Sequence, residues 1–185
     1  MREAAQQLEF EGLLSRQANR RIVTVPTAED VADIYRVRLL LEIGGIEASA
    51  NATPTELGTL ETAFQRFARA VRDEDSFAVV ERHIDFHAAT VAFMRSARLD
   101  ATYRAAMVQL RLAFVITDRD HDDLNEQIAT HQEILEHVQN ARIAQCVTEL
   151  RRNYSKAERE VLESLGVYHA KGSSRVRGTR DRGKV

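Results

Sequence analysis

Three histidines stand where packed helices normally carry apolar side chains. In the stretch ERHIDFHAAT, residues 81–90, His83 and His87 are four residues apart and would lie one turn apart on the same helix face. His131 occupies the middle of an apolar stripe in a separate segment. Neutral imidazole is the commonest protein ligand for zinc, nickel and similar ions. If the two segments are neighbouring helices, the three side chains predict a buried site for a divalent metal ion.

The alternative is that each histidine is an ordinary core residue whose ring forms a hydrogen bond with one neighbour. Burying three imidazoles separately would cost about 1–3 kcal/mol each in unmet hydrogen bonding, whereas a shared metal ion would remove that cost for all three together. The remaining histidines, His121, His137 and His169, lie off the apolar stripes, so we expect them to be solvated.

The elements that must position these histidines are helices. No glycine or proline occurs between Gly58 and Gly166, and strand-and-turn architectures need such residues at their turns. We therefore expect an all-α antiparallel bundle of six to seven helices, with six covering residues 29–50, 54–73, 76–95, 97–118, 122–139 and 141–165. The second begins at a capping box, Thr53 to Glu56, and the last ends at Gly166.

Three of these helices show an apolar residue every three or four positions, which is typical of packed antiparallel helices. The stripe of the third helix is Phe77, Val80, Ile84, His87, Val91 and Met94. That of the fifth is Leu124, Ile128, His131, Leu135 and Val138. That of the sixth is Ile143, Val147, Leu150, Tyr154, Ala157 and Val161. We expect these faces to form the core.

Composition narrows the class of protein. The 185 residues suffice for one substantial domain with a small appendage, and the net charge of −2 is unremarkable. With no run of 18 apolar residues and no signal-like N-terminus, we expect a cytoplasmic protein without a membrane segment. The single cysteine, Cys146, excludes a disulfide framework and is expected to be a small core filler.

The two ends of the chain differ from the predicted bundle. The first residues predict a short helix ended by Gly12, and residues 15–26 predict two extended pieces that turn at residues 18–19. A helix followed by a two-stranded ribbon with arginines at its tip resembles part of a winged helix-turn-helix, although a dimerisation arm would fit equally well. Residues 168–185 carry six basic residues against one acidic residue and predict a disordered tail, which either solubilises the chain or touches nucleic acid.

Several segments, in this order, resemble the GntR-family transcriptional regulators of the FadR subfamily. REAAQQLEFEGLL followed by RIVTV resembles the end of a recognition helix and its wing. DIYRVRLLLE, residues 33–42, resembles the opening helix of the family's ligand-binding FCD domain. HIDFH resembles its D-x-x-F-H motif, and HQEIL its later H-x-x-I segment. The resemblance covers about residues 1–165.

The resemblance implies a divalent metal held by one aspartate and three histidines, with a small carboxylate effector beside it. The aspartate position falls on His83, the next two histidines on His87 and His131, and the last histidine on Asn153. Asp85 would point to another helix face and could not replace the lost carboxylate. Neutral nitrogens and one amide favour zinc or nickel over manganese or calcium. The alternative is that the metal has been lost and a polar cavity remains.

The resemblance also implies roles for arginines. Arg38 falls on the residue that clamps the effector carboxylate, for which a guanidinium is geometrically suited, although an ion pair with Glu42 four residues on would explain it equally well. Four residues of the head are candidates to face DNA: Arg2, Gln6, Arg20 and Arg21. A family member has two further helices before the recognition helix. The head therefore resembles a truncated one, for which we expect weak or absent specific DNA binding.

Together these observations predict three parts: a partial winged-helix head over 1–26, a helical effector-binding domain over 27–167 and a basic tail over 168–185. The leading hypothesis is a dimeric, ligand-responsive transcriptional regulator that binds a small organic acid at a metal centre. The alternatives are a metal-dependent enzyme on the same histidines and a helical interaction module without metal. An enzyme is disfavoured because no glutamate or aspartate falls at a helical spacing that would aim it at the histidine face.

Overall fold

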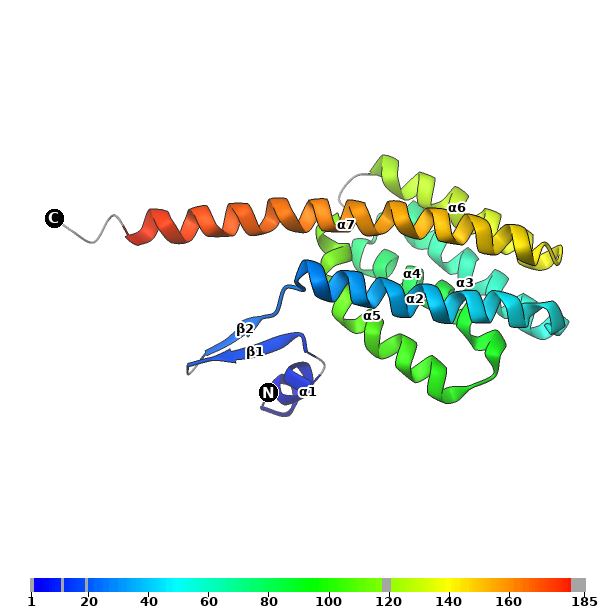
Figure 1. Cartoon of the computed structure of the whole chain (residues 1–185), viewed down its shortest axis with the longest axis horizontal. Helices are drawn as coiled ribbons and strands as arrows, with labels where there is room; N and C mark the ends of the chain where they lie inside the picture. Colours follow the sequence, from blue (N-terminus) through cyan, green and yellow to red (C-terminus); the bar gives the residue numbers. More distant parts are fainter. Residues whose placement is uncertain (1, 11, 19, 118–120, 181–185) are drawn as a thin grey trace.

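A computed structural model of the chain describes residues 2–10, 12–18, 20–117 and 121–180, with the backbone alone for residues 2, 10, 112, 115–117, 121–123 and 167–180. A small head precedes a helical bundle (Figure 1). The head consists of α1 (Arg2–Phe10), β1 (Leu14–Gln17) and β2 (Arg20–Val23). The bundle consists of α2 (Ala28–Ala48), η1 (Ser49–Asn51), α3 (Pro54–Arg72), α4 (Ser76–Val91), η2 (Ala92–Met94), α5 (Ala97–Thr117), α6 (His121–Gln139) and α7 (Ile143–Arg180). The predicted all-α bundle with a partial wing is confirmed.

The head is a helix joined to a two-stranded antiparallel ribbon. Leu14 pairs with Val23 and Gln17 with Arg20, and Ala18 takes a positive φ of 52° in the turn between the strands. Arg21 donates from Nε to Glu9 Oε1 at 2.6 Å, which ties the wing to α1. In Figure 1 the head lies beside one end of the bundle, and β2 leads directly into α2.

The bundle is organised around α2. This helix packs against α4, α5 and α7, while α3 packs against α4 and α6. In Figure 1, α7 lies alongside α2 and runs in the opposite direction. Side chains from every helix of the bundle, α2 to α7, form the main core, which includes Ile46, Phe86, Tyr103, Met107 and Leu150. Cys146 is buried within it as expected.

Capping side chains fix where the helices begin. Thr53 Oγ1 accepts from the backbone N–H of Glu56, and the Glu56 carboxylate accepts from the backbone N–H of Thr53, so the predicted capping box is present. Thr27 and Asp30 form a second box at the start of α2. This second box fixes the residue at which α2, the first helix of the bundle, begins after the wing.

The last helix is longer than the sequence predicts. Gly166 does not end it, and the backbone of α7 stays helical to Arg180, through most of the predicted disordered tail; residues 181–185 lie outside the described residues. One glycine costs a helix only about 1 kcal/mol relative to alanine. A Cβ at Gly166 would meet nothing within 4 Å, so no tertiary contact forces the chain to turn there.

Phe77 is also a correction, because it is 74% exposed rather than in the core. It lies in the first turn of α4. Side chains on a helix lean toward its N-terminus, so a residue in the first turn extends past the region that neighbouring helices cover. The rest of the stripe does face the core, with Val80, Ile84 and Val91 buried.

None of the helices, over the stretch that the structure describes, combines the length and the apolar character required to cross a bilayer.

Gly45 sets the separation between α2 and α4. A Cβ built there would lie 2.1 Å from the carbonyl oxygen of Thr90, so any side chain would force the two helices apart. We expect Gly45→Ala to destabilise the fold by about 1–3 kcal/mol, as overpacking of cores does. Gly58→Ala is the matched control, because a Cβ there meets nothing within 4 Å and should stabilise α3 by about 0.5–1 kcal/mol. Urea unfolding of both variants checks the opposite signs, and equal stability of the two variants would contradict this role of Gly45.

Glu56 joins the end of η2 to the start of α3. Hydrogen bonds from Arg95 and from Thr53 lower the pKa of its carboxyl from 4.5 to about 2. Because the folded state binds this proton less tightly than the unfolded state, the contribution of Glu56 is present above pH 4.5 and is lost as the pH falls from 4.5 to about 2. Glu56→Gln should therefore be less stable than the native chain at pH 7, with the difference shrinking across that window. Urea unfolding at several pH values measures it, and a pH-independent difference would count against the assignment.

Candidate metal centre

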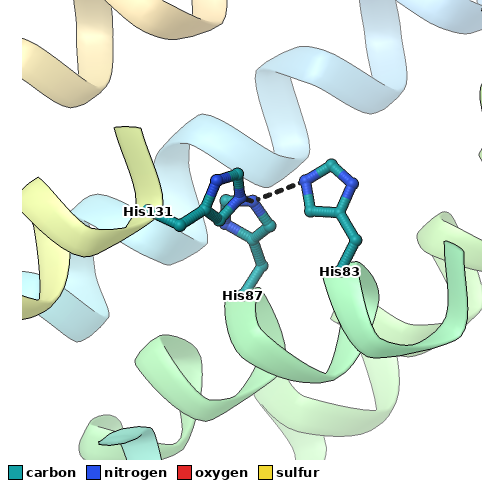
Figure 2. Close-up of side chains that lie close together, drawn as sticks. All are labelled: His83, His87 and His131. Carbon is teal, nitrogen blue, oxygen red and sulfur yellow. Dashed lines mark hydrogen bonds between the residues drawn. The ribbon is translucent and has the colours of Figure 1, made fainter. Parts of the chain in front are cut away.

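The three predicted histidines meet inside the bundle. His83 and His87 project side by side from α4, and His131 faces them from α6 (Figure 2). The Nε2 atom of His87 lies 3.0 Å from Nε2 of His83 and 2.9 Å from Nε2 of His131. The three side chains each direct one ring nitrogen to this meeting point, and these nitrogens all lie within 4.8 Å of one another.

Aromatic rings pack around the cluster. Phe67 packs against His83 and His131, and Phe114 stacks on His83 with ring centroids 5.2 Å apart. The three histidines are between 3% and 8% exposed. Burial, aided by the proximity of His87, lowers the pKa of His131 to about 3 and that of His83 well below its usual value. Neutral imidazoles are therefore favoured at both positions, as metal ligation requires.

Two hydrogen bonds determine where the ring protons lie. His87 Nδ1 is 2.7 Å from the buried carboxylate of Glu42, and His131 Nδ1 is 2.5 Å from the backbone carbonyl of Gln127. Burial would raise the pKa of Glu42, but His87 and Arg38 outweigh burial and lower it, so Glu42 is an anion that can only accept. Both Nδ1 atoms therefore donate, and when both rings are neutral this leaves lone pairs on the Nε2 atoms of His87 and His131.

These lone pairs face each other across 2.9 Å, so the meeting point requires a positive charge. An extra proton on His87 is one solution, but a single N–H can be aimed at only one of the two neighbouring Nε2 atoms. A metal ion can accept lone pairs from all three rings. Nitrogens held at about 2.0–2.1 Å from a metal lie about 2.9 Å apart at right angles and about 3.4 Å apart at the tetrahedral angle. The two separations from His87 Nε2, 3.0 and 2.9 Å, lie at the right-angle end of this range.

Arg38 and Asn153 lie in the wall of the same pocket. The cavity has a volume of about 310 Å³, and Tyr35, His83, His87, His131 and Tyr154 also line it. The Arg38 guanidinium is 3% exposed and lies between the rings of Tyr35, Phe114 and Tyr154. Its Nε is 3.7 Å from Glu42 Oε1, so the predicted ion pair exists as a loose contact, without a hydrogen bond from Nε to any acceptor among the described residues.

The other predicted residues lie apart from this pocket. Gln6 and Arg20 are exposed on the head, Arg21 is paired with Glu9, and the side chain of Arg2 lies outside the described residues. Asp85 faces Arg82 and Arg104 on another side of α4, as expected.

His137 corrects the prediction of a solvated histidine. Its side chain is only 6% exposed, and its Nε2 is 2.6 Å from the Glu149 carboxylate. The turn between α6 and α7 brings Glu149 over His137, a contact that periodicity within one helix does not reveal. The side chains of His121 and His169 lie outside the described residues.

Two residues of the site were missed by the sequence reasoning. Glu42 was considered only as a partner of Arg38, and Tyr103, which donates to Glu42 Oε1 at 2.7 Å, was not considered. A usable signal existed, because Tyr35, Leu39 and Ile46, at helical spacings of seven, three and four from Glu42, share its helix face.

Comparison with known proteins gives the class first. A protein described as transcriptional regulator GntR from Rhodococcus sp. RHA1 shares 27% identity at a TM-score of 0.78, over 88% of this chain and 78% of that chain. E. coli McbR/YncC matches at 17% identity and a TM-score of 0.73, over 88% and 83%. The metal-free FCD domain of TM0439 matches at 11% and 0.62, over 78% and 100%. The last two similarities show the fold alone. No curated protein sequence matches the chain.

The class is thus that of the GntR-family transcriptional regulators, which are not enzymes. More particularly, the model of the FCD domain matches residues 33–156, and the chain belongs to the FCD domain family. An FCD domain of this type implies a ligand-responsive transcriptional regulator.

The histidine cluster predicts that the chain binds one zinc or nickel ion. We expect chelator-treated protein to take up one ion, with a rise in melting temperature because the ion binds only the folded state. His131→Ala should weaken binding by more than the roughly 10–100-fold that loss of an outer contact costs, because it removes a ligand. His137→Gln on the same helix is the control and should bind normally. Calorimetric titration measures both, and equal affinity of the two variants would contradict the site.

Proposed function

We propose that this chain senses a small organic acid at a zinc or nickel centre in the cytoplasm and thereby controls the binding of a dimer to DNA. The single observation that supports it most directly is the convergence of three Nε2 atoms, two of which present lone pairs to each other, in a pocket that Arg38 also lines.

In this proposal His83, His87 and His131 hold the metal through Nε2, and Asn153 of α7 adds its amide oxygen. The donor set is neutral and mainly nitrogen, which favours zinc or nickel over manganese or calcium. When bound, the metal supplies a positive charge that attracts an anion. Since no ligand carries a negative charge, that attraction is stronger than at a site with an aspartate ligand.

The effector is a small carboxylate that Arg38 clamps. The Nε of Arg38 and the Nδ1 of His83 are buried without an acceptor among the described residues, and both side chains line the cavity. An anion is the species that accepts from such donors. The volume of about 310 Å³ admits a metabolite of modest size, and the faces of Tyr35 and Tyr154 suit its apolar part.

Signal transfer to DNA follows the chain from the pocket to the head. Arg38 and Glu42 lie on α2, and the wing is separated from the first residue of this helix by the short segment 24–27. A change in α2 on effector binding therefore acts directly on the wing. Four residues of the head are proposed to contact DNA: Arg2, Gln6, Arg20 and Arg21. Pairing with Glu9 holds Arg21 close to α1, so that helix and wing move together.

Thermal-shift screening of zinc-loaded protein against small mono-, di- and tricarboxylates tests this function. We expect at least one acid to raise the melting temperature and Arg38→Met to abolish that response while retaining zinc, because methionine keeps the apolar stem and removes the charge. Arg82→Met, at a more exposed arginine on the outer side of α4, is the matched control and should keep the response. If no acid stabilises the native chain, or if Arg38→Met responds normally, the proposal that the chain senses an organic acid is wrong.

A further inference from the structure

We infer that Glu42 is a positioning residue of the metal centre, a buried carboxylate that keeps the His87 proton on Nδ1 and supplies negative charge that the ligands lack. The inference rests on the proposed metal binding by His83, His87 and His131. It concerns a residue that contributes no ligand atom of its own and acts through His87.

The contacts of Glu42 support a role directed at His87. The carboxylate is 1% exposed, and its Oε2 lies 2.7 Å from His87 Nδ1. Its other oxygen, Oε1, accepts from Tyr103 at 2.7 Å and lies 3.7 Å from Arg38 Nε. The imidazole of His87 is therefore nearer to this anion than the Arg38 guanidinium, whose Nε is too distant for a hydrogen bond.

Comparison of the three rings shows that His87 is special. The Nδ1 of His131 faces a neutral backbone carbonyl, and the Nδ1 of His83 has no acceptor among the described residues. His87 is also the ring whose Nε2 lies close to both of the others. A carboxylate behind the central ring strengthens that nitrogen as a donor and fixes the ring in the orientation that the cluster needs.

The fold provides for this contact. Glu42 lies on α2 and His87 on α4, and the close approach of these helices depends on the absence of a side chain at Gly45, one turn from Glu42. The charge is thus delivered from a neighbouring helix to a cluster whose own members are neutral. This explains how a set of neutral ligands, with His83 in place of an acid, can still hold a divalent cation.

Glu42→Gln tests the inference, because glutamine keeps the size and an acceptor oxygen but removes the charge. Zinc affinity, measured by competition with a chromophoric chelator, should fall about 10–100-fold. Glu47→Gln is the matched control: it makes the same change at an exposed glutamate of α2, so its zinc affinity should stay close to that of the native chain. Circular dichroism confirms that each variant is folded.

Nuclear magnetic resonance of the zinc-loaded native chain gives a readout that does not depend on any variant. We expect the His87 Nδ1 proton to appear far downfield, with Nε2 showing the nitrogen shift of a metal ligand. In Glu42→Gln the proton resonance should move upfield, since the acceptor is no longer charged.

The outcomes separate the two proposals. If the native chain binds no zinc, the metal centre and this inference fall together. If it binds zinc but Glu42→Gln binds as tightly, or if Glu47→Gln loses as much affinity as Glu42→Gln, only the inference about Glu42 is overturned. A His87 ring bound through Nδ1 would overturn it without any variant.

Discussion

The structure of the pocket depends on one electrostatic constraint, namely that two imidazole lone pairs cannot face each other across 2.9 Å without a positive charge between them. His87 and His131 are held in that arrangement because their Nδ1 protons are already committed, one to Glu42 and one to the carbonyl of Gln127. Phe67 packs against His131 and Phe114 stacks on His83, which limits how far these rings can turn away. The geometry is thus stable only with a cation or a proton at the centre.

Much of this site could be predicted from the chain because it depends on local order. The spacing of His83 and His87 places them on one face of any helix, and the Thr53 capping box fixes the start of α3 wherever that helix packs. The position of His131 in its stripe predicts which way it faces. Helix periodicity therefore sufficed to identify three inward-facing histidines, once neighbouring helices were assumed.

The remainder could not be predicted, because it depends on which helices touch. Glu42 lies behind His87 because α2 approaches α4 closely at Gly45. The sequence of either helix alone does not reveal the close contact of Gly45 with Thr90. His137 was misjudged for the same reason, since its partner Glu149 comes from the next helix. The length of α7 was missed because glycine was given more weight than its cost of about 1 kcal/mol warrants.

In the proposed function, the buried charges of Arg38, Glu42 and the metal ion link effector binding in the pocket to DNA binding by the head. Arg38 and Glu42 carry opposite charges on one helix face. Arg38 Nε lies 3.7 Å from Glu42 Oε1, which is too far for a hydrogen bond. With Glu42 committed to His87, the Arg38 charge is only partly compensated, and a divalent ion at the histidines adds to that excess. An entering anion lowers the electrostatic energy of the whole pocket, and Arg38 is the group that must adjust to bind it. Because Arg38 is part of α2, and α2 continues from the wing, that adjustment is made on the element that also positions the head.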